Sequence, residues 1–141
     1  MSPASLVRLI VRGLRVRPVD VPLSRPLRTA GGVVSSAPFV LVDLATEQGV
    51  VGRSFLFAYT TLVLAPLVRL LEGLGAVLEG QPAVPFALER DLQRTFRLLG
   101  PQGLTGMAMG GIDIACWDAV AQAAGLPLVR LLGGEGRPLL L

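Results

Sequence analysis

The sequence has 141 residues, a length typical of one domain and too short for such a domain together with a barrel of roughly 250 residues. It contains no histidine and no lysine, so its 13 basic residues are all arginines, and its net charge is +3. Histidine and lysine are the commonest proton shuttles near neutral pH, and arginine cannot replace them because it stays protonated. Only carboxylates, a tyrosine and a thiol are left for acid–base chemistry.

Charge and hydropathy bear on which partners the chain can bind. The arginines are spread along the sequence and aromatic residues make up only 5%, so we expect no nucleic-acid partner. The longest uncharged run, Ser54–Val68, has 15 residues, which is shorter than a membrane span of about 20 residues, so we expect no membrane partner. The single cysteine, Cys116, excludes an internal disulfide and indicates a reducing, cytoplasmic location.

The first half of the chain predicts a small, mostly antiparallel sheet. Residues 14–23 alternate in polarity as a strand does, and their prolines restrict this strand to a sheet edge. Residues 24–38 collect proline, glycine and serine, which predicts a long flexible connection whose Gly31 and Gly32 permit positive φ. Two β-rich runs around a short turn then predict a hairpin over Phe39–Phe57.

The second half of the chain predicts helices. Apolar residues recur at helical spacing, with prolines near two of the helix starts and glycines at the ends. The predicted helices are 60–78, regular from near Pro66; 85–100, which starts at Pro85 and ends on Gly100; 103–125, rich in small residues and closed by Gly125; and a short turn within 126–134. Residues 137–141 then begin an extended apolar segment.

The stretch Gly111–Gly134 places two carboxylates, Asp113 and Asp118, beside Cys116 and Trp117 on one predicted helix. Residues five apart lie about 140° apart around a helix, so the two acids do not share a face as an acid–base pair or metal site requires. We interpret both acids as structural groups that bond backbone amides or arginines. We interpret Trp117 as a core residue and Cys116 as a buried small apolar one.

Two segments resemble a known family. The run "MGGIDIACWDAVAQAAGLPLVRLLGG", from Met109, resembles the signature helix and following turn of the mandelate racemase/muconate lactonizing enzyme family of the enolase superfamily. The run "VPLSRPLRTAGGVVSSAPFVLVDLATEQGVVGRSFLFAYT", from Val21, resembles the family's first sheet and its two substrate loops. The likeness covers Gly13–Pro138 and is closest to the mandelate racemase branch.

The resemblance implies an α+β capping domain over residues 1–135, with a three-stranded antiparallel sheet followed by a helical bundle. The TIM barrel of the family is absent from the sequence, and residues 136–141 stand where its first strand would begin. In that family the capping domain covers the mouth of the barrel, which carries the chemistry.

The resemblance also implies a reaction on a 2-hydroxy or sugar carboxylic acid. A lysine or histidine of the barrel removes the proton α to the carboxylate, and Mg²⁺ bound in the barrel stabilises the enediolate. This chain then supplies no catalytic residue and no metal ligand; its partners are the missing barrel, the acid substrate and, at full length, further copies of the enzyme. The implied substrate-binding residues are Leu27, Thr29, Gly31 and Val34 from the first loop and Tyr59 from the second.

Two other hypotheses stay open beside an inert, truncated capping domain. In the second hypothesis, the chain is a self-standing interaction module that retains the capping fold. In the third, which rests on composition alone, it is a basic binder of nucleic acid or membrane surfaces. The high apolar fraction, 52%, predicts a surface that packs on a partner in the first two cases. A barrel with a Lys-x-Lys motif and three spaced acids, encoded downstream of Leu141, would establish the capping domain.

Overall fold

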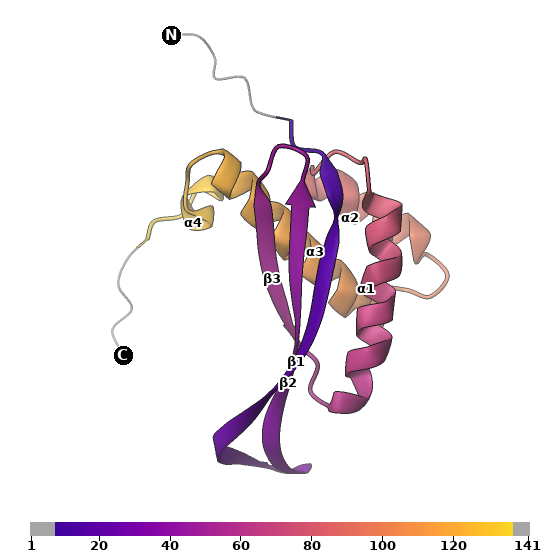
Figure 1. The fold of residues 1–141 in the computed structure, drawn as a ribbon, viewed down its shortest axis with the longest axis vertical. Helices are drawn as coiled ribbons and strands as arrows, with labels where there is room; N and C mark the ends of the chain where they lie inside the picture. Colours follow the sequence, from indigo (N-terminus) through magenta and orange to yellow (C-terminus); the bar gives the residue numbers. More distant parts are fainter. Residues whose placement is uncertain (1–7, 137–141) are drawn as a thin grey trace.

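In a computed structural model, residues 8–136 of the protein form a three-stranded antiparallel sheet with helices against one face. The strands are β1 (Val11–Thr29), β2 (Gly32–Thr46) and β3 (Val51–Phe57), in the spatial order β1-β2-β3. The helices are a short 3-10 helix η1 (Thr61–Val63), α1 (Leu64–Leu78), α2 (Pro85–Thr95), α3 (Gly103–Ala123) and α4 (Leu128–Leu131). Figure 1 shows α3 behind the strands and α1 beside β1. The predicted α+β fold is confirmed, with β1 at a sheet edge.

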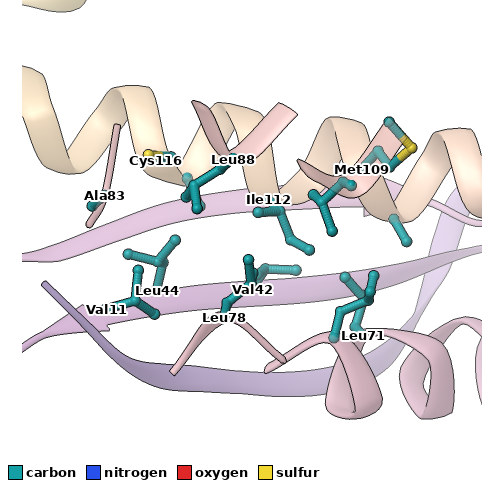
Figure 2. Packing of buried hydrophobic residues seen from close by; sticks show 14 of the residues in the cluster. Val11, Val42, Leu44, Leu71, Leu78, Ala83, Leu88, Met109, Ile112 and Cys116 are labelled. Carbon is teal, nitrogen blue, oxygen red and sulfur yellow. The ribbon is translucent and has the colours of Figure 1, made fainter. Parts of the chain in front are cut away.

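Alternation along β2 explains where the core lies. Val40, Val42 and Leu44 point to the helical face of the sheet and are fully buried. Figure 2 shows Val42 and Leu44 directed toward Ile112 of α3, with Leu71 of α1 nearby. Further buried residues are Leu67, Leu74 and Leu78 of α1, Leu88 and Leu92 of α2, and Ala108, Ala115, Cys116 and Ala119 of α3. The core therefore fills the space between the middle strand and the helices.

Small residues let α3 lie directly on β3. Gly52 faces Ala115 and Ala119, and a Cβ at Gly52 would collide with the Ala115 carbonyl oxygen. Two residues further along β3, the Ser54 hydroxyl donates to the Gly111 carbonyl (2.7 Å). The small-residue composition of this helix is therefore explained by its close approach to a strand.

The prediction of a flexible connection at residues 24–38 is wrong. β1 and β2 continue through this segment as a two-stranded ribbon, with Leu27 opposite Val34. The pairing shifts register between Pro22 and Leu27, where β1 has more residues than β2. Pro22 and Pro26 lie at the ends of this irregular stretch, where the absence of a ladder N–H is tolerated. Proline and glycine in the sequence therefore mark a bulge and a turn rather than a loop.

The ribbon ends in a tight turn at Ala30 and Gly31. Both glycines permit positive φ, and Gly32 uses this freedom with a φ of 126°, whereas Gly31 does not lie in the positive-φ region. The Thr29 hydroxyl donates to the Gly32 carbonyl (2.9 Å) and closes the turn.

The helix boundaries agree in part with the predictions. α1 begins at Leu64, so Pro66 lies in its first turn, as expected. α2 begins at Pro85 as predicted but ends at Thr95 rather than at Gly100. Residues 96–99 form turns instead, in which the N–H groups of Leu99 and Gly100 both donate to the Phe96 carbonyl (3.0 and 2.7 Å).

α3 closes on Gly125, as predicted. Gly125 has φ of 64°, and its N–H donates to the Gln122 carbonyl (3.0 Å) while the next N–H, of Leu126, donates to Ala121 (3.1 Å). These two bonds form the motif that ends many helices on glycine. The predicted extended segment at 137–141 lies outside the described residues.

One helical stretch has the length and hydropathy of a membrane span. Among the residues described, Thr61–Leu78 has a mean hydropathy of 1.8 over 18 residues, of which 28% are buried. Leu67 and Leu71 of this stretch pack in the core, and Arg69 and Glu72 form an exposed ion pair (3.3 Å). We interpret the stretch as a core helix of this domain, because its buried leucines contact the sheet.

Candidate functional site

Four of the five residues implied in substrate binding lie at the free end of the β1–β2 ribbon. Leu27 and Val34 are direct cross-strand partners, so their side chains share one face of the ribbon. Thr29 follows two residues later and is exposed, and Gly31 lies in the turn. Figure 1 shows this ribbon extending beyond the helices. The four residues are thus presented together at one tip.

The fifth residue, Tyr59, follows β3 in a strained backbone conformation. Its φ is 62°, a region that costs a residue with a side chain about 1–2 kcal/mol. The preceding Ala58 N–H donates to the Pro38 carbonyl (2.8 Å), and the Tyr59 ring lies 4.6 Å from the Phe57 ring, centroid to centroid. These contacts hold the exposed Tyr59 at the base of the ribbon.

The structure brings the two predicted loops to the same end of the sheet without placing all five residues in contact. Val34 and Pro38 are separated by about 13 Å of strand, at about 3.3 Å per residue, and Tyr59 lies near the Pro38 level. The side chains supply apolar contacts and two hydroxyls. Such a surface can cover a ligand and exclude water, but it offers no base for proton abstraction near neutral pH.

Asp113 and Asp118 do not form a carboxylate pair. Asp118 accepts the backbone N–H of Arg53 (2.8 Å) and the side-chain amide of Gln122 (2.7 Å), and the same amide donates to the Val51 carbonyl (3.0 Å). These bonds satisfy polar groups along the outer edge of β3, which would otherwise be open to another chain. The structural interpretation of Asp118 is confirmed.

Asp113 lies instead in a cavity of about 240 Å³ between α2 and α3, which Glu89 also lines. Burial, and secondly the charge of Glu89, raises the pKa of Asp113 above its ordinary value. Burial, and secondly the charge of Asp113, raises the pKa of the Cys116 thiol to about 12, so this thiol is inert as a nucleophile. Trp117 is only half-buried and meets the exposed Phe86 edge to face at 5.4 Å, at the margin of the core.

The described acids do not fit a magnesium site. Within residues 8–136, no three carboxylate, histidine or cysteine side chains gather as a metal ion would require. Asp118 is engaged by N–H donors and Asp43 by arginines, while Asp113 and Glu89 make only a pair. This part of the chain therefore offers no ligand set for the Mg²⁺ that the resemblance implies.

The sequence prediction missed a charged cluster on the sheet face opposite the helices. Asp43 is buried there beneath Arg15, Arg17 and Arg53. The signal was an acid inside the apolar run 39–46, with arginines at alternating positions of the neighbouring strands. Arginines that are dispersed in sequence therefore converge in space.

Comparison with known proteins gives the same domain. The sequence profile of a family described as "Mandelate racemase / muconate lactonizing enzyme, N-terminal domain" matches residues 11–133. A solved structure of an enolase from Bradyrhizobium, complexed with magnesium and mandelic acid, is 51% identical with a TM-score of 0.88, and the match covers 94% of this chain and 37% of that one.

Two curated proteins are also similar over most of the chain. The hydrophobic dipeptide epimerase of Enterococcus faecalis is 30% identical over 130 residues, which is 88% of this chain and 34% of the epimerase. The D-mannonate dehydratase of Novosphingobium aromaticivorans is 34% identical over 119 residues, which is 77% of this chain and 28% of the dehydratase. This chain thus spans about a third of the length of its relatives.

Proposed function

Because the chain belongs to the mandelate racemase/muconate lactonizing enzyme family, as its N-terminal domain, we propose that it caps the active site of a magnesium-dependent enolase-superfamily enzyme. The reaction removes the proton α to a carboxylate. The base and the metal ligands belong to a barrel outside this chain, and this chain supplies the wall that covers the substrate.

One observation carries the capping role: the ribbon tip and Tyr59 lie at the same end of the sheet. The tip presents isolated apolar side chains, Leu27 and Val34, beyond the part of the sheet that the helices cover. If the barrel mouth lies against this end, the tip excludes water from the bound substrate. Exclusion of water strengthens the electrostatic interactions inside the active site.

We propose a small 2-hydroxy acid with an apolar body, such as mandelate, as the substrate class, ahead of a sugar acid. The 51% identical Bradyrhizobium enolase is complexed with mandelic acid, which supports this choice. On the ribbon face that carries Leu27 and Val34, the Thr29 hydroxyl already donates its hydrogen to the Gly32 carbonyl, so this face offers few hydrogen bonds to a ligand. A sugar acid would leave several hydroxyls without partners on this side, which costs affinity.

The test joins this chain to the barrel of the Bradyrhizobium enolase, in place of that enzyme's own N-terminal domain. Exchange of the α-proton of mandelate is followed by NMR in deuterated buffer with Mg²⁺. We expect exchange by the chimera and none by residues 1–141 alone, because the chain has neither lysine nor histidine. An inactive but folded chimera would favour the self-standing module.

Matched variants of the ribbon test the residue assignment in the same chimera. Leu27→Ala should lower kcat/KM about tenfold or more, since one lost apolar contact is worth about 1–3 kcal/mol. Val33→Ala is the control, because Val33 is as exposed as Leu27 (62% against 58%) but lies on the other face of the ribbon. Equal losses in both variants would contradict the assignment.

A further inference from the structure

The face of the sheet opposite α1 and α3 carries a charged end and an aromatic end. Strand register aligns its side chains in rows across β1, β2 and β3. We call this surface the outer face; its rows are Arg15, Asp43 and Arg53; then Arg17, Leu41 and Phe55; then Val19, Phe39 and Phe57. In Figure 1 the strands stand in front of α3, so this face is turned away from that helix.

Three arginines surround one buried carboxylate at the charged end. Arg15 Nη2 donates to Asp43 Oδ2 at 2.6 Å and Arg17 Nη2 at 3.1 Å, while Arg53 Nε lies 3.7 Å from Oδ1. Three guanidinium charges against one carboxylate leave a net charge of +2. Each guanidinium has five N–H donors, so donors remain on these exposed side chains for a further anion.

Aromatic rings form the other end of the outer face. The Phe39 ring lies 5.7 Å from the Phe55 ring and 5.4 Å from the Phe57 ring, between centroids. Phe55 is 64% exposed although it lies within a strand. An exposed aromatic side chain next to excess positive charge is typical of a recognition surface.

The size of the outer face favours a short segment as its occupant. β3 has seven residues, so the face measures roughly 23 Å by 14 Å, at about 3.3 Å per residue and 4.8 Å per strand. The area of this face is therefore well below the roughly 800 Å² that each partner buries in a stable complex. A second copy would also bring its own arginines, while its only acid in these rows, Asp43, is already buried and paired.

The arrangement of charge favours protein over single-stranded nucleic acid. Nucleic acid requires cations along the backbone path and free ring faces for bases. Here the cations gather at one end, and Phe39 and Phe55 pack against each other edge to face. We propose that the outer face docks an acidic, apolar protein segment, whose carboxylates pair with Arg15, Arg17 and Arg53 and whose apolar side chains pack around Phe55.

This inference goes beyond the capping function. The capping residues lie at the ribbon tip and at Tyr59, whereas the docking residues lie in the body of the sheet. The chimera assay responds to Leu27 and the docking assay to Phe55, so either proposal can fail without the other.

The docking test uses the 141-residue chain and a fluorescent synthetic peptide of about 12 residues, rich in glutamate at one end and leucine at the other. We expect binding with a Kd of about 10–100 µM, and we expect this Kd to increase as the salt concentration rises from about 0.05 to 0.5 M. Arg53→Gln and Phe55→Ala should each weaken binding about tenfold. Arg69→Gln and Phe86→Ala, which change residues that are also exposed but lie on helices, are the matched controls and should bind like the parent chain.

Thermal melting verifies that the four variants fold, and a peptide with glutamine in place of glutamate tests the charge contact without changing the protein. That peptide should also bind about tenfold more weakly. The proposal is overturned if a lysine-rich peptide binds as tightly, or if the acidic peptide shows no binding at about 1 mM. It is also overturned if single-stranded DNA binds more tightly than the acidic peptide, or if the chain dimerises and Phe55→Ala abolishes the dimer.

Discussion

Gly52 is the position where the contact between β3 and α3 leaves no room for a side chain. Its missing Cβ would collide with the Ala115 carbonyl and lie 2.8 Å from Ala119. Since these atoms belong to the helix backbone or to a Cβ attached directly to it, they cannot move aside easily. We therefore expect Gly52→Ala to lower the free energy of unfolding by about 1–3 kcal/mol. Gly73→Ala is the control: nothing lies near its Cβ on exposed α1, so it should add about 0.5–1 kcal/mol. Urea unfolding measures both, and an unaffected Gly52→Ala would refute the packing.

Cys116 gives a prediction about pH and reactivity. Its pKa rises from 9.0 to about 12 on folding, so the stability gained from the neutral thiol is full below pH 9.0 and is lost as pH rises through about 12. Near pH 8 only about one thiol in 10,000 is ionised in the folded chain. Iodoacetamide should therefore label the folded chain at least about 100-fold more slowly than the urea-unfolded chain. Fast labelling of the folded chain would show that the thiol is accessible.

At the scale of elements, the β1–β2 ribbon can be tested by its register. Leu27 and Val34 are directly opposite, so their Cα atoms should lie about 4.5–5.5 Å apart, within the range of a disulfide. Leu27→Cys combined with Val34→Cys should cross-link under mild oxidation, as mass spectrometry would detect. Leu27→Cys with Val33→Cys should not, because Val33 points to the other face. A flexible loop would give similar yields for both pairs.

The elements that the sequence predicted correctly are those whose pattern is local. The hairpin at Phe39–Phe57 and the helices at 64–78 and 103–123 follow from polarity alternation, helical spacing and caps. The ribbon did not follow, because Pro22, Pro26 and the glycines look like loop residues until the pairing partner is known. Strand pairing across a bulge is non-local, and it overrides the local preference of these residues.

The residues of the candidate site also depend on contacts between segments that are distant in the sequence. No local pattern identifies the capping residues, and Leu27 and Tyr59 were proposed only through the family resemblance. The arginine cluster was missed because Arg15 and Arg53 are far apart in sequence and meet only through Asp43 on the middle strand. A buried acid in an apolar strand run is the local sign of such a cluster, since a buried charge needs partners.

At the scale of the whole molecule, several large apolar side chains are exposed on the helical side of the domain. Phe86, Leu98, Leu99 and Ile114 are all exposed, and Leu98 almost completely. Burying each gains about 1.5–3 kcal/mol, or roughly 6–12 kcal/mol for four. Association costs about 4–15 kcal/mol in lost motion, so these residues alone support weak association.

We therefore expect the isolated chain to self-associate in the range of tens of micromolar, with a helical-side contact as the cause. Light scattering should show mass that rises with concentration. Leu98→Asp combined with Leu99→Asp should reduce that rise, whereas Phe55→Ala on the outer face should not. A barrel of the Bradyrhizobium enolase, supplied without its own N-terminal domain, should convert the oligomers to a one-to-one complex, because we expect the helices near Gly111–Gly134 to pack on the barrel together with the ribbon tip. A monomer at all concentrations with a sharp melting transition would instead mean that the domain has a closed surface of its own, and would favour the self-standing module.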